Sequence, residues 1–231
     1  MTGVKLKYTL LFIATVLLLR VSSVHAQELE PRTYTHIPIG LNFLVAGYAY
    51  TAGGVVFDPT IPIVNANIRI HGTVLAYARS IKIGGLSGKF DMLLPYAWLS
   101  GSAEYQGQTV PREVSGLGDS RLRMTVNFLG APPLALSEYK GASQDLVAGA
   151  SLLVYLPMGQ YDPEKLVNIG TNRFTIKPEL GISRVFGKFS MELATGVAFF
   201  TANNDFYGDV TRTQAPIVTL QAHGIYSFKG G

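Results

Sequence analysis

Nine ionisable side chains lie in strand-like stretches of this sequence, at spacings that would let them act together. They carry both signs of charge: Arg69, His71, Asp91, Asp119, Arg121, Arg123, Lys177, Glu179 and Glu192. Because side chains alternate between the two faces of a β-strand, we expect these nine to face one enclosed, hydrated interior. Opposite charges should pair there, since an unpaired buried charge is costly. Two roles stay open: a salt-bridge network that fills a small barrel, favoured for most of them, or a polar constriction that selects permeants.

Motifs for enzyme chemistry are weak. The Gly-Leu-Gly at 116–118 is followed by Arg121 where a dinucleotide-binding fingerprint needs its third glycine, and a strand pattern rather than a helix comes next. The Gly-Gly-Leu-Ser-Gly at 84–88 lacks the glycine that a nucleophile elbow needs two residues before its serine. Three histidines outside the first 26 residues show no metal-ligand spacing: His36, His71 and His223. We therefore predict no catalytic residue, no cofactor, no metal site and no enzymatic activity.

The stretch 118–129 shows the strand pattern most clearly. Asp119, Arg121 and Arg123 alternate with apolar residues such as Leu122, so that one face is charged and the other is apolar. A soluble sandwich turns its apolar face to a core, whereas an outer-membrane barrel turns it to lipid. One strand cannot distinguish the two, but recurrence of the pattern around the chain can.

The pattern recurs along the chain. Pro95 should lie at a bulge or a strand end, and 101–117 and 201–215 are predicted loops. Long extracellular and short periplasmic connections should alternate, as in bacterial barrels, except at 130–144, where a short helix or cap is expected. Each predicted strand is long enough to cross a bilayer at the usual tilt. The eight predicted strands are 40–50, 67–79, 89–100, 118–129, 145–157, 171–183, 189–200 and 216–228.

Composition and the start of the chain favour the membrane alternative. Hydrophobic residues make up 48% of the chain and charged residues only 15%, against roughly 25% charged in ordinary soluble domains. Residues 1–26 have the pattern of a secretory signal peptide, with Lys5 and Lys7 before the apolar run 10–19 and cleavage near Ala26. That run is too short for a membrane-anchor helix, and no later run has spanning length, so any membrane crossing uses strands.

The remaining chain is nearly neutral. Three of the 19 lysines and arginines lie in the leader, which leaves 16 against 15 aspartates and glutamates. This balance excludes a nucleic-acid partner, because backbone binding needs clustered positive charge. No cysteine is present, so an exported chain would fold without disulfides. We predict three parts: a signal peptide over 1–26, a periplasmic N-terminal lead-in over 27–39 and an outer-membrane β-barrel over 40–231.

Five segments resemble a known bacterial family, the "putative MetA-pathway of phenol degradation" proteins. The segments are 40–48 (GLNFLVAGY), 116–123 (GLGDSRLR), 157–162 (PMGQYD), 168–173 (NIGTNR) and 177–181 (KPELG). The resemblance covers roughly residues 35–228 and implies a transporter-like outer-membrane barrel associated with the breakdown of aromatic compounds. Family members usually continue with further strands past the position of residues 226–228. Two alternatives therefore stay open: an eight-stranded closed barrel, or strands that belong to a larger barrel.

We expect an all-β, antiparallel, up-and-down transmembrane barrel in the outer membrane of a Gram-negative bacterium. The leading function is passive uptake of small hydrophobic or aromatic compounds. The alternatives are a structural or adhesive small barrel with a plugged lumen and, less favoured, a barrel-embedded hydrolase or acyltransferase. The expected partners are outer-membrane lipid, the barrel-assembly machinery and small aromatic or hydrophobic molecules.

Overall fold

The computed structural model describes residues 32–55, 63–139, 146–208 and 210–228. The predicted signal peptide 1–26, its cleavage near Ala26 and the first part of the predicted lead-in lie outside the described residues. The boundaries of the three predicted parts therefore stay a prediction. The described residues include no helix that is long and apolar enough to cross a membrane.

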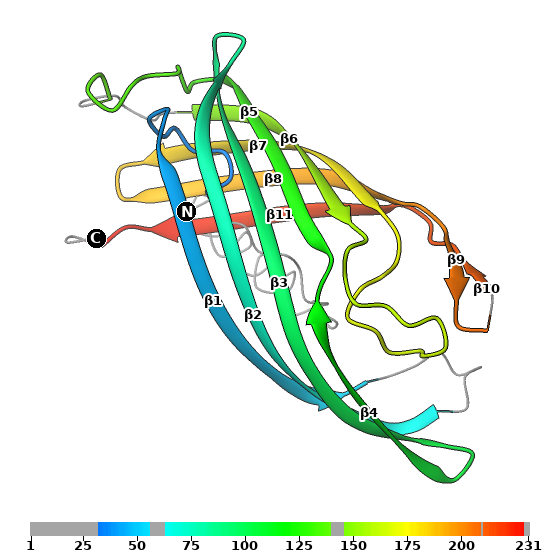
Figure 1. The fold of residues 1–231 in the computed structure, drawn as a ribbon. Coiled ribbons are helices and arrows are strands. Elements are labelled where there is room, and N and C mark those ends of the chain that lie inside the picture. Colours follow the sequence, from blue (N-terminus) through cyan, green and yellow to red (C-terminus); the bar gives the residue numbers. More distant parts are fainter. Residues whose placement is uncertain (1–31, 56–62, 140–145, 209, 229–231) are drawn as a thin grey trace, which may run out of the picture. The chain divides into compact units, whose positions relative to one another are not determined.

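The described chain folds into one large antiparallel sheet and a small hairpin, shown in Figure 1. The strand order of the main sheet is β1-β2-β3-β5-β6-β7-β8-β11. Strand β4 lies off this path and pairs with β3, and β9 and β10 form the separate hairpin. The strands are β1 (Asn42–Gly54), β2 (Ile63–Ile83), β3 (Leu86–Tyr105), β4 (Gln108–Leu117), β5 (Ser120–Leu129), β6 (Leu146–Leu156), β7 (Thr175–Phe186), β8 (Phe189–Phe200), β9 (Asn203–Phe206), β10 (Val210–Arg212) and β11 (Ile217–Tyr226).

The prediction of eight antiparallel strands in an up-and-down order is confirmed. Each predicted strand overlaps one strand of the main path, and consecutive strands along that path are neighbours. The sheet curls into a half-barrel, and β1 and β11 are its two edges. No ladder joins these edges within the described part of the chain. This open sheet agrees with the alternative in which the eight strands belong to a larger barrel.

A tight turn joins β2 to β3. Its two central residues, Gly84 and Gly85, have φ values of 55° and 86°. Two positive φ angles in a two-residue hairpin loop are typical of a type I′ turn, whose twist matches that of the flanking strands. Glycine suits both positions because it has no Cβ to clash there. The turn fixes the long β2–β3 register from Ile83↔Leu86 onward.

Two predicted loops contain strands. Residues 101–117 form the end of β3 and the whole of β4, and a turn with positive φ at Gln106 and Gly107 connects them. Because this hairpin is largely polar, its sequence lacks the hydrophobic alternation by which strands are predicted. Residues 201–215 contain the short β9–β10 hairpin. In the connection 130–144, the described residues up to 139 include no helix and form one isolated bridge, between Ile39 and Ala135.

Pro95 lies in the middle of β3, at the point where the strand changes its partner. β3 pairs with β5 up to Leu93 and with β4 from Tyr96 onward. Proline has no N–H to donate to a ladder, so it fits at the break between two partners. Its carbonyl oxygen accepts a hydrogen bond from the Gly118 N–H at 2.9 Å. The proline thus marks a ladder junction instead of the predicted bulge or strand end.

Candidate functional site

Residues 32–39 lie across one face of the sheet, which we call the inner face. The strand register defines its rows, because cross-strand partners project from the same face. One row runs from Asp91 through Arg123 and Leu153 to Lys177. On the other, outer face of the same strands, large apolar side chains such as Leu180 (59% exposed) are open to the surroundings. In β5 to β8 the predicted separation of polar and apolar faces is therefore present.

Segment 32–39 is held by side chains of the inner face. The Arg32 N–H donates to a Glu192 carboxylate oxygen at 2.6 Å, and Arg123 donates to the Thr33 hydroxyl at 3.1 Å. The Tyr34 hydroxyl lies 3.1 Å from Glu179, to which it donates. Polar side chains of three strands thus satisfy a segment that would otherwise be buried with unpaired polar groups.

The same segment continues toward β1 with further hydrogen bonds. The Asn127 amide donates to the Thr35 carbonyl oxygen at 3.3 Å, and the Ser80 hydroxyl donates to the Pro38 carbonyl oxygen at 2.6 Å. Ser80 belongs to β2, so the segment reaches from β8 to β2 before it enters β1. It therefore covers one stretch of the inner face almost from edge to edge.

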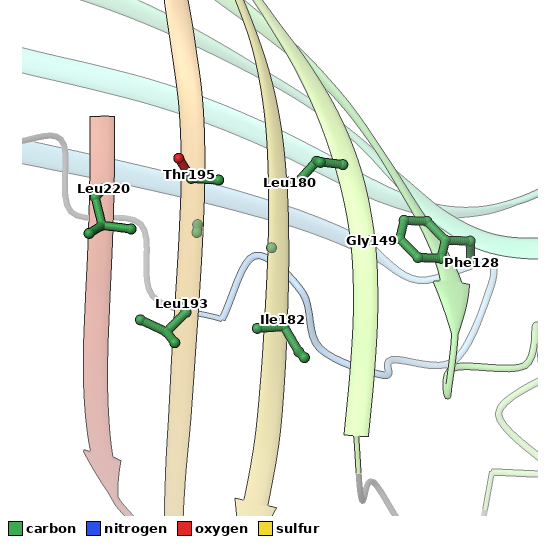
Figure 2. Close-up of a pocket in the computed structure, with 9 residues that line it drawn as sticks. Phe128, Gly149, Leu180, Ile182, Leu193, Thr195 and Leu220 are labelled. Atoms are coloured by element: carbon green, nitrogen blue, oxygen red, sulfur yellow. The ribbon is translucent and has the colours of Figure 1, made fainter. Parts of the chain in front are cut away.

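Two glycines make room for the ring of Tyr34. A Cβ built on Gly149 would come within 2.8 Å of the Tyr34 ring, and one built on Gly181 would overlap that ring. Tyr34 is only 2% exposed and packs with Val147 and Ala131 in a small buried cluster. On the outer face of the same strands, an apolar groove lies between side chains such as Leu180, Ile182 and Leu193 (Figure 2). The two glycines thus leave the space on the inner face that the aromatic ring fills.

Opposite charges pair at two places on the inner face. Arg121 lies 3.6 Å from Asp91 on the neighbouring strand β3. Lys177 lies 3.1 Å from Glu179 on the same strand, and both side chains are less than a tenth exposed. A buried pair avoids the large cost of an isolated charge. These contacts supply the pairing that we expected of charges in a confined interior.

Asp119 has a different task from the paired charges. Its carboxylate accepts hydrogen bonds from the Gly159 N–H at 3.0 Å and from the Thr171 N–H and hydroxyl at 2.8 and 2.6 Å. The backbone of Gly159 also contacts that of Gly170 so closely that neither has room for a Cβ. Asp119 therefore closes the base of the loop between β6 and β7.

Arginine and phenylalanine side chains gather where that loop enters β7. The Arg173 guanidinium lies 4.7 Å from the centre of the Phe200 ring and donates through Nη2 to the Gln214 amide oxygen. Arg212 lies over the Phe206 ring at 5.1 Å. Burial, and next the positive charge of Arg212, lower the pKa of Arg173 below its ordinary value. We call Arg173, Arg212, Phe200 and Phe206 the arginine cluster.

Strand β2 differs from β5 to β8, because several of its polar side chains lie on the outer face. β2 pairs Ala78 with Asp91, so the even-numbered residues of β2 share the inner face with Asp91. Arg69 and His71 are odd-numbered and lie on the outer face, which differs from the prediction for these two. The His71 ring contacts the Tyr48 hydroxyl at 2.7 Å and the Tyr50 ring at 4.8 Å.

A family model described as "Putative MetA-pathway of phenol degradation" matches residues 48–229. The chain belongs to this family. No curated protein matches the sequence significantly. Among solved structures, the chain is similar to the crystal structure of an outer membrane channel from Pseudomonas putida F1, with a TM-score of 0.67 and 19% identity over 88% of this chain and 73% of that chain. At this identity the likeness shows a common fold, and the family match confirms the resemblance seen in the sequence.

In this member of the MetA-pathway family, the nine predicted residues fall into three groups. Asp119 anchors a loop, whereas Arg69 and His71 lie on the outer face. Whether the inner face encloses a lumen stays a prediction. Six residues share the inner face of β3, β5, β7 and β8: Asp91, Arg121, Arg123, Lys177, Glu179 and Glu192.

Sequence reasoning missed Tyr34 and the arginine cluster. Tyr34 lies in the predicted lead-in 27–39, which has two prolines and no periodicity and therefore no strand pattern to mark it. The signal that could have found it is the pair Gly149 and Gly181, which occupy polar-face positions of two successive predicted strands and leave a gap for a large side chain. Arg173 has the alternation of an inward residue, but its partner Gln214 is distant in sequence.

Proposed function

We propose that this chain is an outer-membrane channel through which small hydrophobic or aromatic compounds enter a Gram-negative cell passively. Membership of the family and the fold of an outer membrane channel support this proposal. The apolar outer face of β5 to β8 supports it physically, because lipid is the solvent that suits such a surface. Lipid and the barrel-assembly machinery are then the partners, and the leader directs export.

The class of permeant follows from the inner face at the β1–β3 end. Its rows on β1 and β2 carry Val45, Ile70 and Val74, of which Val45 is 57% exposed and the other two are partly exposed. An apolar wall binds apolar molecules because contact removes both surfaces from water. This uncovered apolar wall is the single observation that favours hydrophobic over hydrophilic permeants.

A second candidate function is a structural barrel with a plugged interior. Its support is segment 32–39, which fills the inner face over β5 to β8 and is held by buried hydrogen bonds. A segment fixed in this way stiffens the sheet and would also obstruct flux. The two candidates therefore differ in whether compounds pass the intact protein.

Uptake into cells separates the two. Cells that carry the full-length gene and cells that carry an empty vector are given radiolabelled naphthalene, and the initial rate of cell-associated label is measured. For a passive channel we expect a severalfold higher rate that rises linearly with concentration and is insensitive to an uncoupler. A hydrophilic sugar is the control permeant and should show no gain. Equal naphthalene rates in both cell types would contradict the channel and favour the structural barrel.

A further inference from the structure

The arginine cluster contains a buried positive group with unused hydrogen-bonding capacity. Arg173 is 9% exposed, and its Nη1 atom has no hydrogen-bond partner in the described part of the chain. Among the described residues, the Nη2 atom donates to a neutral acceptor, the amide oxygen of Gln214. A guanidinium forms its strongest hydrogen bonds with an anionic partner that uses both of its nitrogen atoms. Among the described residues, the hydrogen-bond partners of Arg173 therefore neither balance its positive charge nor use its Nη1 donor.

Arg212 strengthens the demand for an anion. Its charge acts on Arg173, whose pKa is lowered first by burial and then by Arg212. Two neighbouring positive charges repel each other, and one negative charge between them removes that repulsion. Arg212 itself is exposed on the β9–β10 hairpin and has the face of Phe206 as its neighbour. It can therefore meet a ligand in solution before Arg173 does.

The two phenylalanines give the site an aromatic part. Phe200 pairs with Thr175 in the register, and Thr175 pairs with Tyr155, so these three residues belong to the inner-face row of Arg121. A ligand at Arg173 would thus begin on the inner face that the proposed permeation path uses. Rings stack or pack edge-to-face with a further ring and add to the attraction beyond the area buried.

We propose that Arg173 and Arg212, with Phe200 and Phe206, form a binding site for a small aromatic carboxylate. The Gln214 amide oxygen occupies the position that one carboxylate oxygen takes in the complex, and the second oxygen pairs with Nη1. The planar fork of the guanidinium matches a carboxylate in this arrangement. The inference deepens the proposed function and rests on it, because it assigns the inner-face path an anionic aromatic substrate class.

The test compares benzoate with benzamide, which has the same ring and nearly the same shape but no charge. Full-length protein is refolded in detergent micelles, and each compound is titrated by isothermal calorimetry. We expect benzoate to bind the native protein about tenfold or more tightly than benzamide, the difference typical of hydrogen bonds to a charged group. Equal binding of the two compounds would overturn the proposal. Acetate tests the aromatic part and should bind more weakly than benzoate; equal binding would reject the aromatic class.

Variants locate the binding. Arg173→Gln should reduce benzoate affinity to that of benzamide. Arg212→Gln should reduce it by about threefold, because Arg212 is exposed and its charge is screened by salt. The matched control is Arg184→Gln, which removes an arginine that also lies over a phenylalanine, Phe186, at 4.9 Å on the same strand. Benzoate affinity that falls equally in the control, or that persists in Arg173→Gln, would overturn the site.

A second variant decides the question if Arg173→Gln does not fold. Gln214→Glu supplies the site with its own carboxylate, and should abolish benzoate binding while the heat-modifiable band of the folded barrel remains. Unchanged benzoate affinity in this variant would contradict the proposal. Binding in micelles needs no transport, and naphthalene uptake needs no anion site. Failure of this inference is therefore distinguishable from failure of the proposed channel.

Discussion

In β5 to β8 most charged side chains lie on the inner face beneath segment 32–39. In β2 the inner face is mostly apolar, and polar side chains such as Arg69 and His71 lie on the outer face. Glu179 is 7% exposed and contacts Tyr34. His71, by contrast, lies on the outer face with Tyr48 and Tyr50. The difference shows that alternation only separates a polar from an apolar face of a strand. Which of the two turns inward depends on what covers the inner face. Where a polar segment covers the inner face, hydrogen-bonding residues lie beneath it.

The largest effect is expected for Tyr34→Ala. The substitution empties a buried site and removes a donor from Glu179, so the free energy of unfolding should fall by about 4 kcal/mol. Urea titration of the refolded protein in detergent, followed by circular dichroism, measures this change. The control at the other end of the sheet is Tyr50→Ala, where the ring is 53% exposed and a change under about 1 kcal/mol is expected. Equal losses at the two sites would contradict the contrast between covered and open regions.

The next largest effect is expected for Glu179→Gln. It leaves Lys177 buried without its charged partner, and the free energy of unfolding should fall by about 3 kcal/mol. The same urea titration detects the loss. Arg69→Gln, at an exposed position of the outer face, should change it by less than about 0.5 kcal/mol. A tolerated Glu179→Gln would show that the inner face of β7 is wet.

A smaller effect is expected for Gly181→Ala, because its methyl group would overlap the Tyr34 ring. Overpacking of this kind should cost about 2 kcal/mol. Gly53→Ala in β1 is the matched control, since a Cβ there meets no atom within 4 Å. In the double variant with Tyr34→Ala the added cost of the methyl group should disappear, which a double-mutant cycle would reveal as strong coupling. Additive costs would place the ring elsewhere.

The smallest effect on stability is expected from single cysteines that report the orientation of β2. The chain has no cysteine, so His71→Cys and Ile70→Cys can each be labelled with one fluorophore. In vesicles that contain brominated lipid, we expect strong quenching at position 71 and weak quenching at position 70, because adjacent residues face opposite sides of a strand. The reverse pattern would restore the orientation predicted from the sequence.

Much of the fold could be predicted because it depends on local pattern. Alternation located every strand of the main path. The hairpin formed by the end of β3 and by β4 was missed because residues 101–117 are mostly polar or small and show no clear period-two hydrophobicity. For the predicted site, the sequence indicated that opposite charges would pair, as Arg121 and Asp91 do, but it did not identify the partners.

The sequence by itself determined the all-β class, the succession of strands, the two-faced ribbons and the family. Only the tertiary structure decided which face of β2 turns inward, that Tyr34 rests over Gly149 and Gly181, and that Arg173 forms a hydrogen bond with Gln214. The physical reason is that the alternation of polar and apolar residues is set locally, within one strand. Whether the polar or the apolar side turns inward depends on groups brought to that face from distant parts of the chain. A covering segment without periodicity carries no local signal of where it will lie.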